Sequence, residues 1–117
     1  MKKILLGLIM VSVMSNADAE TRWIGVSGTV ENISVYETTD TILFTLSSAG
    51  ETVSHCTNKT NFAISGTAPS DRRKQLLSVL LSSRASGKPV SVAYSDTECV
   101  PWDTNQNAYR RVRKIGQ

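Results

Sequence analysis

The sequence predicts a mainly β domain with one helix, and three observations lead to this fold class. Several short segments alternate apolar and polar residues with a period of two, which is typical of strands with one buried face. One segment, residues 69–86, instead places leucines at helical spacing. Turn-forming residues separate these segments along the chain. We therefore expect a small sheet that packs against a single helix.

The first strand is expected over residues 22–36. Ile24 and Val26 alternate with polar or small neighbours, and the apolar positions then shift by one residue to Ile33 and Val35. A β-bulge produces such a shift and bends the strand. A strand bent in this way serves two sides of a small barrel.

Three further strands are expected before the helix. Residues 41–46 alternate cleanly, and shorter strands are expected at residues 51–56 and 62–64. Polar turns separate them.

The helix is expected from about Pro69 to Ser86, with Thr67 or Ser70 as a cap and Gly87 as the stop signal. Four leucines are expected on its inner face, namely Leu76, Leu77, Leu80 and Leu81. A strand at residues 89–95, a long polar loop at 98–107 and a last strand at 108–115 follow. This order of three or four strands, one helix and two more strands fits an OB-fold-like five-stranded barrel with one helix between strands 3 and 4. A generic α+β sandwich is the alternative.

The N-terminus has the layout of a secretory signal peptide over residues 1–19. Lys2 and Lys3 precede an apolar run at residues 4–14, and small residues follow at positions 17–19. The run is too short to span a bilayer, so no membrane span is expected after cleavage. The sequence thus predicts an exported protein, periplasmic or secreted, with one domain at residues 20–117.

The only two cysteines, Cys56 and Cys99, lie in the exported part. An even number of cysteines in an oxidising compartment favours one intramolecular disulfide. The alternatives are a pair of free thiols and a zinc site, and a zinc site is disfavoured because the only histidine, His55, directly adjoins Cys56. A disulfide here would close a loop of about 43 residues and stabilise the domain by about 4 kcal/mol.

One stretch resembles a known family. A cysteine-bearing segment from Cys56 through Phe62 is followed by the helix, then by Ser-Gly-Lys-Pro-Val-Ser-Val at residues 86–92, and then by Cys99. This pattern resembles the B subunits of AB5 toxins, especially the subtilase-cytotoxin and pertussis-like branch. The resemblance implies a secreted OB-fold domain that forms an oligomeric ring and binds host glycans. The chain lacks that branch's second cysteine pair.

The composition gives little support to an enzyme. A single histidine and scattered carboxylates leave acid–base or triad chemistry without its parts, and neither a phosphate loop nor a dinucleotide motif is present. No metal or cofactor is expected. The net charge of +3 is too small to indicate nucleic acid. The sequence therefore favours a non-catalytic binding module.

The candidate binding residues form two groups. Trp102 with Asp103 and Asn105 combines an aromatic ring with carboxylate and amide groups, as sugar sites do, and Tyr36 at a strand end is a second aromatic candidate. In the alternative interpretations, Trp102 packs over the disulfide and Tyr36 is an ordinary strand tyrosine.

The second group is the basic cluster near the C-terminus, which comprises Arg110, Arg111, Arg113 and Lys114. These charges either protect a sheet edge, or pair with a neighbouring subunit, or bind an anionic ligand.

Two hypotheses for the function follow. The first is an exported, toxin B-subunit-like module that recognises host glycans as a homo-oligomer. The second is a periplasmic accessory or inhibitor-type protein that binds another protein through its basic strand and loops.

Overall fold

The structure, a computed structural model, describes residues 21–117, so the predicted signal peptide at residues 1–19 lies outside the described residues. The described part is mainly β with one helix, which confirms the predicted fold class. Its elements are β1 (Trp23–Gly28), β2 (Val30–Val35), β3 (Ile42–Leu46), β4 (Phe62–Ile64), α1 (Ser70–Ser86), β5 (Val90–Trp102) and β6 (Asn105–Gly116).

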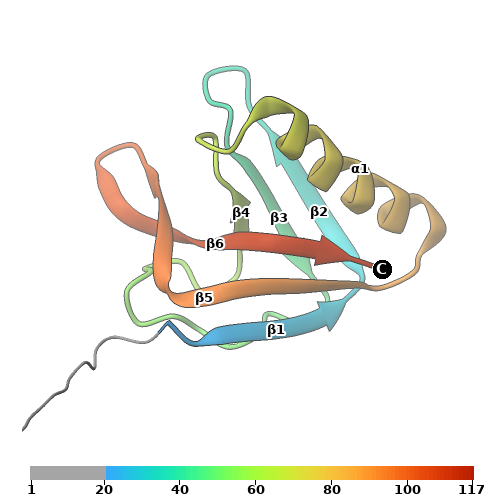
Figure 1. Cartoon of the computed structure of the whole chain (residues 1–117), viewed down its shortest axis with the longest axis horizontal. Coiled ribbons are helices and arrows are strands. Elements are labelled where there is room, and N and C mark those ends of the chain that lie inside the picture. The colour runs from blue at the N-terminus through green and yellow to red at the C-terminus, as the bar shows by residue number, and fades with distance from the viewer. Residues whose placement is uncertain (1–20) are drawn as a thin grey trace, which may run out of the picture.

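The strands form one six-stranded sheet in the order β1-β5-β6-β4-β3-β2 (Figure 1). All neighbouring strands are antiparallel except β4 and β6, which are parallel. The two strands at the ends of this order, β1 and β2, are consecutive in the chain and separated only by Thr29. In Figure 1 β1 ends beside the start of β2.

The strand count differs from the five strands that the sequence predicts. Thr29 divides the expected strand at residues 22–36 into β1 and β2, and the expected strand at residues 51–56 is absent, so four strands precede the helix. The predicted register shift is present in β2, where the pairing with β3 is irregular between Val30 and Asn32. The pattern of apolar residues therefore located the bulge but not the interruption.

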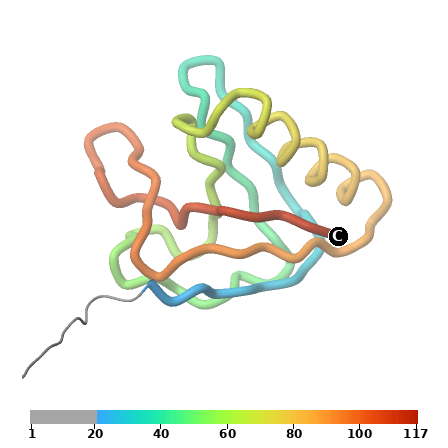
Figure 2. The backbone as a smooth tube through the Cα atoms, viewed as in Figure 1, coloured from blue at the N-terminus to red at the C-terminus, as the bar shows by residue number. Residues whose placement is uncertain are grey.

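The prediction of a long polar loop at residues 98–107 is wrong. β5 continues to Trp102 and β6 begins at Asn105, so the two strands form a long hairpin, drawn in orange to red in Figure 2. Within it, Cys99 and Val100 pair with Arg110 and Tyr109. Strands with one face toward solvent carry many polar residues. Because a polar loop has a similar composition, the sequence pattern does not distinguish the two.

Residues 51–56 form an irregular segment in place of the predicted strand. Val53 and Cys56 are both buried, and the Cys56 amide donates to the Val53 carbonyl, with 3.0 Å between N and O. The Glu51 carbonyl accepts hydrogen bonds from the Tyr94 hydroxyl and the Arg110 guanidinium. Side chains from β5 and β6 therefore satisfy backbone groups that a strand would pair.

The Cys56–Cys99 disulfide is present and joins this segment to β5, with 5.6 Å between the two Cα atoms. Cys56 is fully buried in the main core, and Cys99 packs against that core. The structure thus confirms the predicted pairing.

The helix α1 matches the predicted range, and it packs against β2, β5 and β6. Leu80 is fully buried, whereas Leu81 is 52% exposed, so the predicted inner face is wrong at Leu81. The N-cap position is Pro69 and has no side-chain cap, while Gly87 ends the helix with a φ of 74° as expected. Within residues 21–117, no helix is long and apolar enough to cross a membrane.

Candidate functional site

Three aromatic side chains gather where the β5–β6 hairpin meets the end of β2. The Trp102 ring packs edge-to-face against Tyr36, with 5.1 Å between ring centroids, and against Tyr109, with 5.7 Å between centroids. Tyr36 is 44% exposed, and the other two rings are half-buried. Edge-to-face pairs contribute about 0.5–1.5 kcal/mol each beyond their burial, so the two tyrosines hold the Trp102 ring in place.

A small apolar cluster supports this aromatic group from below. Trp102 and Tyr109 pack against Leu43, Ala63 and Val100, which are all buried. Cys99 packs against the larger core instead. The support of Trp102 is therefore this cluster, whereas the sequence had offered packing over the disulfide as the alternative.

Trp102 borders two shallow hollows that carry polar side chains. One has a volume of about 220 Å³, and its further lining residues are Thr57, Asn58, Asn105, Ala108 and Tyr109. The other has a volume of about 230 Å³, and its further lining residues are Thr38, Thr39, Pro101 and Asp103. Trp102 thus lines two hollows that also carry hydroxyl, amide and carboxylate groups.

The two polar candidates of the hairpin are exposed. Asp103 lies in the turn between β5 and β6 with a φ of 53°, a conformation that Asp adopts more readily than most residues. The Asn105 amide donates to the Thr57 hydroxyl at 2.8 Å, and its oxygen accepts from the Asn107 amide at 3.0 Å. These bonds fix the orientation of the Asn105 side chain at the rim of the hollow.

Backbone hydrogen bonds attach the segment that carries Thr57 and Asn58 to β6. The amide of Thr57 donates to the Asn107 carbonyl at 3.0 Å, and that of Asn58 donates to the Ala108 carbonyl at 2.9 Å. The first hollow therefore has walls from two segments that are far apart in the sequence.

Arg110 is not part of this surface, although the sequence grouped it with the candidate binding residues. Its side chain is fully buried, and its guanidinium donates to the carbonyls of Ala49 (2.5 Å), Glu51 (3.1 Å) and Lys59 (3.2 Å). Burial lowers the pKa of Arg110 from its ordinary value. The structure gives this residue an internal bonding role.

Arg111 and Arg113 lie on the opposite face of β6 from Arg110, the face that also carries Tyr109, and neither of them lines a Trp102 hollow. Arg113 forms an ion pair with Glu98 of β5, with its Nε 2.9 Å from Oε1. The hydrogen bond from Arg113 lowers the pKa of Glu98, and the same bond raises the pKa of Arg113. The basic cluster is thus divided: Arg110 is internal, whereas Arg111, Arg113 and Lys114 border a cleft between β6 and α1.

Sequence reasoning did not select Tyr109, Thr57 or Asn58 as site residues. The signal for Tyr109 was present, because Tyr109 and Arg111 alternate with buried Ala108, Arg110 and Val112 along β6. Thr57 and Asn58 had no such signal, since only the folded chain brings them to Trp102.

Within the part of the chain that the structure describes, no group of three or more His, Cys, Asp or Glu side chains is placed to hold a metal ion. The chain matches no known family model, no curated protein and no solved structure.

Proposed function

We propose that this protein is an exported, non-catalytic binding module that recognises a carbohydrate through the surface around Trp102. The observation that carries the proposal is the aromatic group of Tyr36, Trp102 and Tyr109, together with the two polar hollows that Trp102 lines. The disulfide supports export, because such bonds persist in oxidising compartments.

The chemistry of this surface suits a sugar. An aromatic ring offers a flat apolar face to the C–H groups of a pyranose. Asn58, Asn105 and Asp103 supply amide donors, amide acceptors and carboxylate acceptors for hydroxyl groups. Binding of this kind needs no cofactor.

The test is a glycan array probed with the mature, oxidised protein, followed by titration of the best glycan. Trp102→Ala should weaken binding at least tenfold, because it removes the central ring. Trp23→Ala is the matched control, since Trp23 is 58% exposed at the start of β1 and forms none of these aromatic pairs. Equal affinity of the Trp102→Ala variant and the wild type would exclude this surface as the sugar site.

We also propose that the sheet is an OB-fold-like five-stranded barrel. This proposal is supported by the chain order, since β1 and β2 stand at opposite ends of the sheet and are separated only by Thr29. If β1 and β2 are counted as one bent strand, this strand connects the two ends of the sheet. The barrel then has five strands, and α1 follows the third of them.

The resemblance to AB5 toxin B subunits extends the proposal to a homo-oligomer that presents several copies of the Trp102 surface. The disulfide joins a cysteine that precedes α1 in the chain to one that follows it, which is consistent with that resemblance. Light scattering on the mature protein tests it. A mass near five subunits supports the ring, and a monomer at all concentrations excludes it.

A protein partner is the second candidate, in an accessory or inhibitor-type role. Val35 is 64% exposed next to Tyr36, and apolar and aromatic side chains of this kind anchor protein interfaces. Val35→Ser distinguishes the two candidates. It would leave glycan affinity unchanged and would weaken a protein complex.

A further inference from the structure

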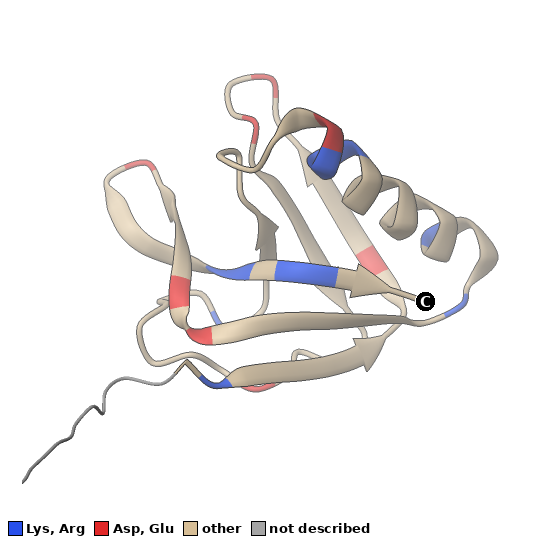
Figure 3. Cartoon of the chain, in the orientation of Figure 1, with Lys and Arg blue, Asp and Glu red and all other residues tan. Residues whose placement is uncertain are grey.

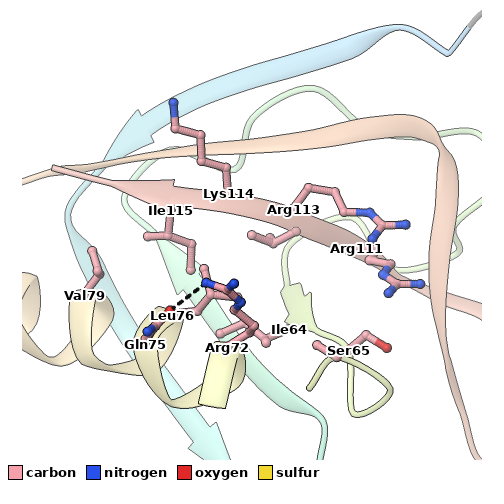
Figure 4. Close-up of a pocket in the computed structure, with 12 residues that line it drawn as sticks. Ile64, Ser65, Arg72, Gln75, Leu76, Val79, Arg111, Arg113, Lys114 and Ile115 are labelled. Carbon is pink, nitrogen blue, oxygen red and sulfur yellow. Dashed lines mark hydrogen bonds between the residues drawn. The ribbon is translucent and has the colours of Figure 1, made fainter. Parts of the chain in front are cut away.

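A cleft with a volume of about 410 Å³ lies between α1 and β6, and it shares no lining residue with the Trp102 hollows (Figure 4). β4 pairs with β6 only at Phe62↔Arg110 and Ala63↔Arg111, and beyond these pairs the cleft is lined by residues of β4, β6 and α1. Its volume falls in the range of small-molecule sites.

The cleft has an apolar floor. Leu76 and Val79 reach it from the helix, and Ile64, Val112 and Ile115 reach it from β4 and β6. Binding of an apolar group to such a floor is favourable, because each Å² of apolar surface removed from water contributes about 25 cal/mol. Water is therefore a poor occupant of this part of the cleft.

The walls of the cleft carry positive charge and no carboxylate. Arg72 lines it from α1, and Arg111, Arg113 and Lys114 line it from β6. Figure 3 shows basic positions on β6 and at the start of α1. In Figure 4 Arg72 rises from the helix, the Arg111 and Arg113 side chains lie near one another, and Lys114 extends away from Arg72.

Three of these four cations form no ion pair within residues 21–117, although the charge of Arg111 helps to lower the pKa of Glu98. Arg113 pairs with Glu98, whereas Arg72, Arg111 and Lys114 form no ion pair among the described residues. Arg72 donates only a long hydrogen bond to Gln75, at 3.4 Å. Its charge near the start of α1 opposes the helix dipole, so this position is mildly unfavourable for folding.

We propose that the cleft binds a small anionic amphiphile, with its oxyanion head group held by Arg72 and Arg111 and its apolar body on the floor. Guanidinium groups bind carboxylate and phosphate oxygens in a bidentate manner, which favours one head group shared between the two walls. This site lies apart from Trp102, and its existence does not depend on the proposed carbohydrate site.

The experiment measures binding of decanoate and of decyl phosphate to the mature protein by calorimetry, below their micellar concentrations. Decanol tests the need for the head group, and inorganic phosphate tests the need for the apolar body. We expect one ligand per chain for at least one of the two amphiphiles, and at least tenfold weaker binding of decanol and of inorganic phosphate.

Arg72→Gln and Arg111→Gln should each weaken binding at least tenfold. Lys74→Gln is the matched control, because it removes the same charge from an exposed position of α1 that does not line the cleft. Thermal melting of each variant checks that it is folded. The proposal is overturned if decanol binds as tightly as both anionic amphiphiles, or if the Arg72→Gln and Arg111→Gln variants bind like the Lys74→Gln variant.

Discussion

The guanidinium carbon of Arg110 lies 4.0 Å from the centre of the Phe62 ring, inside the core. The same group bonds carbonyls of the segment at residues 49–59, which lacks regular structure. One strand residue thus connects the core to the segment that delivers Cys56 to the disulfide and Thr57 to the Trp102 hollow. Its positive charge is offset by carbonyl dipoles and aromatic faces, and no carboxylate contacts it within residues 21–117.

Arg110→Lys should lower the free energy of unfolding by about 2 kcal/mol or more. Lysine keeps the charge, but its single ammonium cannot reach all three carbonyls or stack on Phe62, and buried acceptors left without donors cost about 1–3 kcal/mol each. Urea denaturation measures the change. Arg111→Lys, on the opposite face of β6, should stay within about 0.5 kcal/mol of wild type. Similar values for both variants would contradict the role assigned to Arg110.

Replacement of both cysteines by serine should destabilise the domain by about 4 kcal/mol, because the disulfide closes a long loop in the unfolded chain. Adding a reductant to the wild type should lower the melting temperature in the same way, and the double variant should not respond to the reductant. If the melting temperature of the wild type is the same with and without reductant, the disulfide contributes no stability.

Gly50→Ala should be destabilising, by at least about 1 kcal/mol. Gly50 has a φ of 70°, and an added Cβ would lie 2.9 Å from the Tyr94 hydroxyl oxygen that bonds Glu51. Gly25→Ala is the control, since its Cβ would meet nothing within 4 Å and its φ is not in the left-handed region. Equal melting temperatures for the two variants would show that the chain can relax around Gly50.

The Glu98–Arg113 ion pair should make stability depend on pH in the acid range. Because the hydrogen bond from Arg113 lowers the pKa of Glu98 in the folded state, the unfolded chain binds more protons there, and stability rises with pH. This contribution is fully present above the ordinary pKa of glutamate and is lost as pH falls through the lower folded value. Partial exposure keeps it below about 1 kcal/mol.

The measurement for this ion pair is urea denaturation between about pH 3 and pH 6, the range in which glutamate titrates. Glu98→Gln should lose less stability than wild type as the pH falls. Glu37→Gln, at an exposed position outside the pair, should follow the wild-type curve. If the free energy of unfolding changes with pH in the same way for the wild type and Glu98→Gln, the ion pair contributes nothing to the pH dependence of stability.

The sequence by itself determined the local features of this protein. Period-two and helical patterns located β3, β4 and α1, Gly87 marked the helix end, and the two cysteines predicted their own pairing. Each of these follows from the propensity or chemistry of neighbouring residues, or from a count small enough to leave one pairing.

The tertiary structure alone decided the rest. Whether Arg110 belongs to the surface or the core depends on which carbonyls and rings surround it, and those come from residues 49–62. The hollow beside Trp102 needs Thr57, and the basic cleft needs Arg72 opposite Arg111. These residues are distant in the chain and meet only because strand pairing and the packing of α1 fix their positions, which no local pattern encodes.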